Sequence, residues 1–141
     1  DGCPASSDLS FDDLCELSDQ LYLENRLEES TACLYRAAGL DQTRGIAYCF
    51  IARNVLAPLD DEADSGPSAS EEVATLEEAV RLLERCVHGS PSFAHGRVML
   101  ARTLLRQRQF QQSAEHSCRY RDLVLSHEDN TWMERNAETL W

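Results

Sequence analysis

The side chains of this sequence best suited to chemistry are its six cysteines and four histidines, and their spacing favours neither catalysis nor metal binding. The cysteines stand singly at positions 3, 15, 33, 49, 86 and 118, and the histidines at 88, 95, 116 and 127 are too dispersed for a zinc motif. Cys49 and His95 could form a nucleophile and base pair, but nothing in the sequence supplies an oxyanion hole. We therefore predict no catalytic residues, no metal and no cofactor, and a protein that is not an enzyme.

Isolated cysteines without a Cys-x-x-Cys pair are typical of reduced thiols that pack as small hydrophobic side chains. The chain also contains no Asn-x-Ser/Thr sequon. These features predict a cytoplasmic protein, with the nucleus not excluded; a disulfide scaffold is the alternative. The sequence contains no apolar stretch long enough to span a membrane and does not start like a signal peptide, so we expect no membrane span.

The charged side chains favour recognition of carboxylates or phosphates by arginine. All 13 basic residues are arginine, against 25 acidic residues, and the net charge of −12 divides into −14 over residues 1–84 and +2 over residues 85–141. Nucleic acid is therefore not an expected partner, because phosphate contacts need a basic surface. Guanidinium groups bind carboxylates with two parallel hydrogen bonds, which makes an acidic protein partner the more suitable ligand.

The elements that position these side chains repeat along the chain. A pattern at Leu14, Leu17, Ser18 and Leu21 recurs 34 residues later at Tyr48, Ile51, Ala52 and Val55, and again at Arg97, Leu100, Ala101 and Leu104. A second pattern at Leu27, Ser30, Leu34 and Ala37 recurs at Leu76, Ala79, Leu83 and Cys86, and Phe110 and Ser113 start a third copy. This spacing predicts stacked helical hairpins.

The segments Asn25–Asp41 and Ala74–Pro91 resemble the second helix of the tetratricopeptide repeat family, and Pro91 lies where that family has its closing proline. The resemblance covers residues 11–126 and implies an all-α, right-handed stack of about three hairpins. We expect helices over residues 11–23, 27–38, 44–57, 71–87, 93–106 and 110–125, with Ser10 capping the first helix, Asn25 breaking it and Gly39 ending the second.

Three segments lie outside the expected hairpins. Residues 1–10 are expected to be flexible, and the acidic residues 58–70 are expected to form a mobile loop inserted within the second repeat. Residues 127–141 are expected to contain a seventh helix over 129–141, either a capping helix or the start of a further repeat. Ser65, Ser68 and Ser70 are candidate regulatory phosphorylation sites; the alternative is a plain insertion.

The resemblance also implies a binding surface, because the first helix of each hairpin lines the concave face in that family. It places nine candidate partner-binding residues there: Tyr22, Ile46, Cys49, Arg53, His95, Val98, Arg102, Leu105 and Arg106. We expect Asp19 and Arg53 to pair across adjacent helices, leaving Arg102 and Arg106 free to bind an acidic and apolar peptide or helix. The alternative is that these arginines pair internally with the chain's own acidic residues.

The family contributes binding surfaces and no chemistry, so the sequence predicts a non-enzymatic protein–protein interaction adaptor or scaffold. Cys15, Asp19 and His95 stand where the chaperone-tail-binding subclass has its carboxylate-gripping residues, which argues against that ligand. A structural module that self-associates in a larger complex is the main alternative, and exposed Trp132, Leu140 and Trp141 would be its mark. A chaperone for a secreted or unfolded client is a third possibility.

Overall fold

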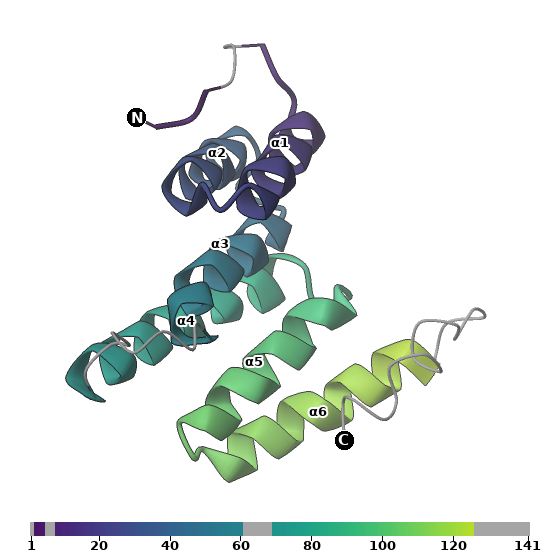
Figure 1. Ribbon diagram of the computed structural model, residues 1–141. Coiled ribbons are helices and arrows are strands. Elements are labelled where there is room, and N and C mark those ends of the chain that lie inside the picture. Colours follow the sequence, from purple (N-terminus) through teal and green to yellow (C-terminus); the bar gives the residue numbers. More distant parts are fainter. Residues whose placement is uncertain (1, 5–7, 61–68, 126–141) are drawn as a thin grey trace.

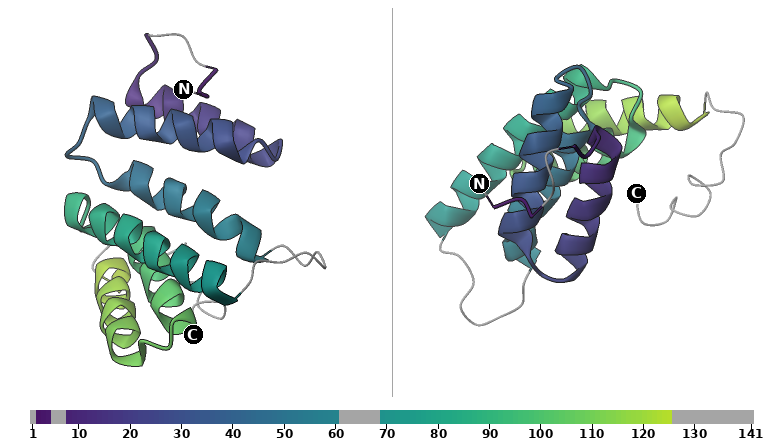
Figure 2. Two further views of the ribbon diagram at one scale, coloured as in Figure 1. Left: turned by 90° about the vertical axis from the view of Figure 1, so that its left-hand side faces the viewer. Right: turned by 90° about the horizontal axis from the view of Figure 1, so that it is seen from above.

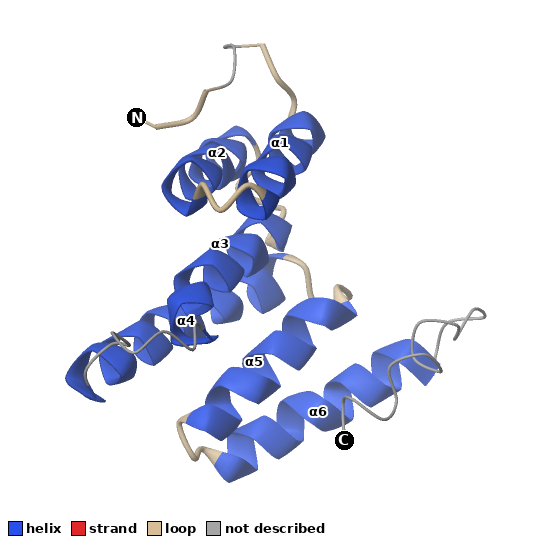
Figure 3. Cartoon of the chain, in the orientation of Figure 1, coloured by secondary structure: helices blue, strands red, loops and turns tan. Residues whose placement is uncertain are grey.

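The computed structural model describes residues 2–4, 8–60 and 69–125, and every regular element in these ranges is helical (Figures 1 and 3). The elements are α1 (Phe11–Leu23), α2 (Leu27–Leu40), α3 (Ile46–Leu56), the short 3₁₀ helix η1 (Ala57–Asp60), α4 (Ala69–Gly89), α5 (Ala94–Arg106) and α6 (Phe110–Leu125). The predicted all-α class is confirmed. None of the helices described is both long and apolar enough to cross a membrane.

Each helix packs on its neighbours in the sequence. Helices α1 and α2 form one hairpin, α3 and α4 a second, and α5 and α6 a third, while α2 contacts α3 and α4 contacts α5. The side view in Figure 2 shows these pairs following one another along the molecule. Four of the five connections have only 3 to 5 residues, and a connection of a few residues cannot carry the chain past its nearest neighbour; the longer one joins α3 to α4.

The turns of the first and third hairpins have the same backbone geometry. Asn25 and Arg108, which lie 83 residues apart, both have positive φ, at 61° and 64°. In each turn the N–H of the next residue donates to a carbonyl five positions earlier at 2.8 Å, which satisfies one of the last helical carbonyls. An arginine rarely adopts this left-handed conformation. Its presence at Arg108 indicates that the turn of this hairpin requires a residue with positive φ.

Small residues lie where the two helices of each hairpin cross. In the first and third hairpins a serine hydroxyl on the second helix donates at 2.8 Å to a backbone carbonyl on the first: Ser30 to Ser18 and Ser113 to Ala101. The second hairpin has alanine at both equivalent positions. All six residues are buried: Ser18, Ser30, Ala52, Ala79, Ala101 and Ser113. The small side chains allow the helix backbones to approach closely.

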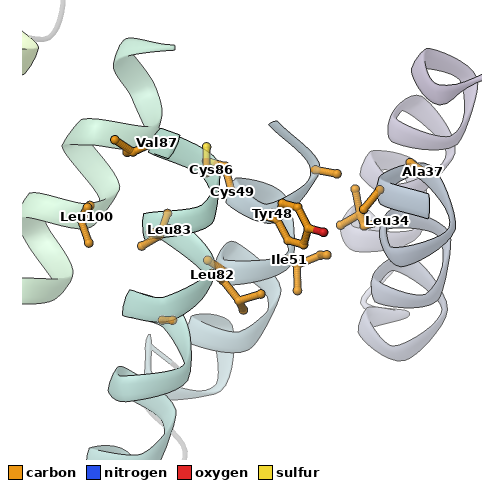
Figure 4. Close-up of a cluster of buried hydrophobic side chains, with 14 of the residues drawn as sticks. Leu34, Ala37, Tyr48, Cys49, Ile51, Leu82, Leu83, Cys86, Val87 and Leu100 are labelled. Atoms are coloured by element: carbon orange, nitrogen blue, oxygen red, sulfur yellow. The ribbon is translucent and has the colours of Figure 1, made fainter. Parts of the chain in front are cut away.

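One apolar core runs through α1 to α5 (Figure 4). It includes Leu34, Ile51 and Leu83, which have no exposed surface, and Leu100 on α5. A smaller cluster joins Val98 on α5 to Tyr120 and Val124 on α6. Burial of these side chains supplies the main stabilisation of the stack.

The helix ends agree with the sequence-based expectation at several points and differ by one or two residues at others. Ser10 caps α1 by accepting a hydrogen bond from the Asp13 N–H at 3.2 Å, and Asn25 lies in the first turn as expected. Gly39 was expected to end the second helix, but α2 continues through it to Leu40. Helix α4 begins at Ala69, two residues before the expected start.

The expected seventh helix and most of the inserted acidic loop lie outside the residues described. This is also true of Ser65 and Ser68, whereas Ser70 is exposed in the first turn of α4. Residues 1–10 were expected to be flexible, but Cys3 is bonded to Cys33 of α2, so this part of the segment is attached to the first hairpin.

Candidate functional site

A groove lies across α1, α3 and α5, on the face predicted to bind a partner. It has a volume of about 270 Å³ and is lined by Tyr22, Arg53, Leu56, Ala57, Met99, Arg102, Thr103 and Arg106. Four of the nine predicted partner-binding residues therefore line one groove: Tyr22, Arg53, Arg102 and Arg106. We refer to this set of eight residues as the arginine groove.

Four neighbouring side chains hold the Arg53 guanidinium in place. Its Nη1 donates to Asp19 Oδ1 at 2.9 Å, as expected from the sequence, and its guanidinium stacks on the ring of Tyr22 at 4.0 Å and on that of Phe50 at 5.1 Å. Its Nε donates to Asn54 Oδ1 at 3.2 Å. Stacking on aromatic faces and pairing with a carboxylate both stabilise a guanidinium that is largely buried.

Arg53 also retains an unused donor. Its Nη2 is buried and has no hydrogen-bond partner among the described residues. An unpaired buried donor costs about 1–3 kcal/mol, so a ligand oxygen that reached this atom would recover stability on binding. The groove therefore contains a polar atom for which the described residues supply no acceptor.

Arg102 and Arg106 were expected to be free to bind a ligand, and this expectation fails for Arg106. Arg106 lies 3.7 Å from Glu72 at the start of α4 and forms an ion pair with it. Both side chains are partly exposed, so this contact is worth at most about 1 kcal/mol and can be exchanged for a ligand carboxylate.

Two of the predicted groove residues belong instead to the interior. Cys49 has no exposed surface, and its thiol lies 3.2 Å from the sulfur of Met99. Val98 is 6% exposed and packs on Tyr120 and Val124 rather than facing a ligand. Neither side chain therefore lines the arginine groove, because α5 covers Cys49 and α6 covers Val98.

The remaining predicted residues lie around the arginine groove but do not line it. Ile46 is half-buried at the start of α3, and Leu105 is 52% exposed and lines a separate pocket between α5 and α6. His95 is on the exposed side of α5 with its ring edge-on to Phe93. Partial burial of the ring, together with the guanidinium groups of Arg102 and Arg53, lowers the pKa of His95, so the imidazole is neutral at pH 7.

The cysteines correct the expectation of six reduced thiols. Cys3 and Cys33 form a disulfide, with Cα atoms 4.8 Å apart, and the other four cysteines are free. This pair does not fit an entirely reduced chain. The argument from cysteine usage for a cytoplasmic location is therefore withdrawn.

A thiol count tests this disulfide. In denaturant without reductant, we expect four thiols to react with a thiol reagent, and six after reduction, because only Cys3 and Cys33 are bonded. Peptide mapping of the unreduced protein should recover residues 3 and 33 in one crosslinked species. Six reactive thiols in freshly purified, unreduced protein would contradict the pairing; Cys33→Ser serves as the control, since it should leave Cys3 reactive without reduction.

Two of the four free thiols, Cys15 and Cys49, are poorly suited to nucleophilic chemistry. Burial raises the pKa of Cys15 to about 11, with Arg44 acting against this and Asp12 and Asp19 adding to it. The hydrogen bond to Cys86, together with burial, raises the pKa of Cys49, and the same bond lowers that of Cys86. Because the thiolate is the reactive form, Cys15 and Cys49 are unreactive near neutral pH.

Several groove residues escaped the sequence-based prediction. Met99, Thr103 and Ala57 complete the lining, and Glu72 provides the carboxylate for Arg106. Glu72 follows the inserted loop, so no repeat spacing relates it to Arg106. Within the described residues, no group of three or more His, Cys, Asp or Glu side chains is arranged to hold a metal ion.

The chain has no match among models of protein families. A search of curated proteins also found no match.

Proposed function

We propose that the protein is a tetratricopeptide-like stack of helical hairpins that binds an acidic and apolar peptide of a partner protein in the arginine groove. The observation that carries this proposal is the groove itself, in which guanidinium groups from α3 and α5 surround the apolar side chains of Leu56 and Met99. Helical repeats with small residues at each helix crossing support the stack. In this proposal the protein binds its partner and catalyses no reaction itself.

The groove chemistry specifies the ligand. Leu56, Met99 and the ring of Tyr22 offer apolar contact, which supplies most of the affinity in such interfaces. Arg102 and Arg106 fix the orientation of a ligand carboxylate by paired hydrogen bonds. The volume of about 270 Å³ suits one or two peptide side chains rather than a whole small molecule.

The test is a peptide-array screen with acidic-apolar peptides, followed by titration of the binders. We expect Arg102→Glu/Arg106→Glu to weaken binding at least about tenfold for each arginine, since a hydrogen bond to a charged group contributes about 1.5–3 kcal/mol. Arg106→Glu alone should weaken peptide binding about tenfold. Circular dichroism establishes that the variants remain folded.

The matched control is Arg81→Glu/Arg119→Glu, which changes the net charge equally at exposed positions outside the arginine groove. This control should bind as the unaltered protein does. Equal binding by the groove variant and the unaltered protein would overturn the proposal and leave Arg102 and Arg106 with a structural role. Concentration-dependent sedimentation without peptide binding would favour the self-assembly module instead.

A further inference from the structure

Three sulfur atoms from three helices meet where α3, α4 and α5 pack together. The Cys49 thiol on α3 lies 3.2 Å from the Met99 sulfur on α5 and forms a hydrogen bond with the Cys86 thiol on α4. Cys49 and Cys86 have no exposed surface, and Figure 4 shows them next to each other where α3 meets α4. We refer to Cys49, Cys86 and Met99 as the sulfur cluster.

Two glycines allow the helices of the sulfur cluster to approach one another. An added Cβ at Gly45 would lie 2.8 Å from Cys86 Cα, and one at Gly96 would lie 2.9 Å from Cys86 Sγ. Cys49 follows Gly45 by one turn of α3, and Met99 follows Gly96 by three residues on α5. The missing side chains therefore let α3 and α5 come close to Cys86, which brings the three sulfur atoms together.

The ligand types of the sulfur cluster select the metal that it suits. Thiolate and thioether sulfurs are soft ligands, which favour Cu(I) over harder divalent ions. Structural zinc almost always takes four ligands, and in the described part of the chain no group of three or more His, Cys, Asp or Glu side chains is arranged to hold a metal ion. Two thiols and one thioether are too few for such a zinc site but match the two or three sulfur ligands of Cu(I).

We propose that the sulfur cluster binds one Cu(I) ion, with the sulfur atoms of Cys49, Cys86 and Met99 as its ligands. Binding forms the copper–sulfur bonds and releases the two thiol protons to solvent, with no change in oxidation state. Metal–sulfur bonds of about 2.3 Å, as in zinc sites, place the sulfur atoms of a trigonal site about 4 Å apart. Met99 is unbranched and only partly buried, so its sulfur can move away from Cys49 by the distance required.

Two arginines favour the ionised form of these thiols, which the metal requires. The hydrogen bond from the Cys49 thiol lowers the pKa of Cys86 in spite of its burial, and the charge of Arg97 acts in the same direction. Arg97 Nε is buried and has no hydrogen-bond partner among the described residues. The hydrogen bond to Cys86, together with burial, raises the pKa of Cys49, and Arg53 acts against both. Two thiolates with one Cu(I) carry a net charge of −1, which these guanidinium groups stabilise.

Met99 connects the sulfur cluster to the surface. It is partly buried and lines the arginine groove, whereas both cysteines lie beneath it in the core. An incoming ion therefore reaches the thioether first and passes from it to the thiols. The metal site goes beyond the proposed peptide binding, which uses neither thiol.

Transfer of Cu(I) from a chelator tests the site. The coloured bicinchoninate complex of Cu(I) is titrated in oxygen-free buffer with the full chain, its Cys3–Cys33 disulfide intact, and the loss of colour measures the transfer. We expect one Cu(I) per chain by native mass spectrometry and a near-ultraviolet absorption band from thiolate-to-copper charge transfer. X-ray absorption at the copper edge should show sulfur ligands only.

Variants of the sulfur cluster should lose the metal. Met99→Leu keeps an apolar side chain of similar size and should weaken Cu(I) binding at least about tenfold, since even the loss of an outer partner of a metal ligand typically costs about 10–100-fold in affinity. Cys49→Ala/Cys86→Ala should abolish the charge-transfer band. Circular dichroism establishes that both variants remain folded.

The matched controls change the same residue types elsewhere in the chain. Met133→Leu alters the other methionine, and Cys15→Ala/Cys118→Ala alters the other two free cysteines; both should bind Cu(I) as the unaltered protein does. No transfer to the unaltered protein, or unchanged affinity in either cluster variant, would overturn the proposal. Loss of binding in Cys15→Ala/Cys118→Ala would also overturn it, because the ion would then lie on other thiols. Copper is titrated without peptide, so this site and the peptide-binding proposal can fail independently.

Discussion

Replacing Gly45 with alanine is expected to lower the free energy of unfolding by about 3 kcal/mol or more. An added Cβ would lie 2.3 Å from the carbonyl oxygen of Cys86 and 2.8 Å from its carbonyl carbon. These are backbone atoms of α4, so no side chain can turn aside to make room. Overpacking typically costs about 1–3 kcal/mol where side chains can adjust, and we expect the upper end or more here. Urea denaturation followed by circular dichroism measures the change.

Gly39→Ala is the matched control. Gly39 lies inside α2, and an added Cβ there would meet nothing within 4 Å. Alanine is favoured over glycine in a helix by about 0.8–1 kcal/mol, so this variant should be more stable than the unaltered protein. A Gly45→Ala variant as stable as the unaltered protein would show that the start of α3 does not approach α4 this closely.

Gly45 matters for the groove as well as for stability. Its N–H donates to Ser90 Oγ at 2.8 Å, and Gly89 lies against it, so the start of α3 is fixed to the end of α4. Helix α3 carries Arg53 and Leu56 into the arginine groove. A shift of α3 at Gly45 would therefore move the ligand-binding side chains without changing any of them.

Local signals in the sequence were sufficient to predict the helices. Ser10 and Asn25 act within one turn of the chain, and the structure confirms both. Gly39 was misjudged because glycine is common just beyond a helix end but is also tolerated inside a helix, where packing of α2 outweighs its cost. The Cys3–Cys33 disulfide joins residues 30 apart with no pattern between them, so spacing alone could not find it.

The candidate site was predicted in part, because repeat spacing identifies a helix face but not what covers it. Arg53 and Tyr22 lie on that face and line the arginine groove. Cys49 lies on the side of α3 that meets α5, and Val98 lies on the side of α5 that meets α6. Which side is covered depends on how successive hairpins are rotated, and that rotation comes from packing contacts far apart in the sequence.

The second large effect is expected at Asn54, whose side chain joins α3 to α2 and, through Ser30, to α1. Its Nδ2 donates to Ser30 Oγ at 3.0 Å and to Thr31 Oγ1 at 3.1 Å, its Oδ1 accepts from Arg53 Nε, and Ser30 in turn donates to the Ser18 carbonyl. Asn54→Leu keeps the branching at Cγ but removes the three hydrogen bonds that the Asn54 side chain makes, at a residue that is only 4% exposed. We expect a loss of about 2–3 kcal/mol, because Arg53 Nε and the Thr31 hydroxyl would lose their partners inside the stack.

A double-mutant cycle with Ser30→Ala separates the hydrogen bond from the packing around it. Removing both polar partners costs less than the sum of the two single changes, so Asn54→Leu/Ser30→Ala should be more stable than additivity predicts by about 1 kcal/mol. Ser113 makes the equivalent bond to the Ala101 carbonyl, and Ala79 shows that alanine fits this crossing. Combining Ser113→Ala with Asn54→Leu should be additive, since the two sites share no partner. Additivity in both pairs would mean that Asn54 stabilises the stack by its volume rather than by connecting α3 to the first hairpin.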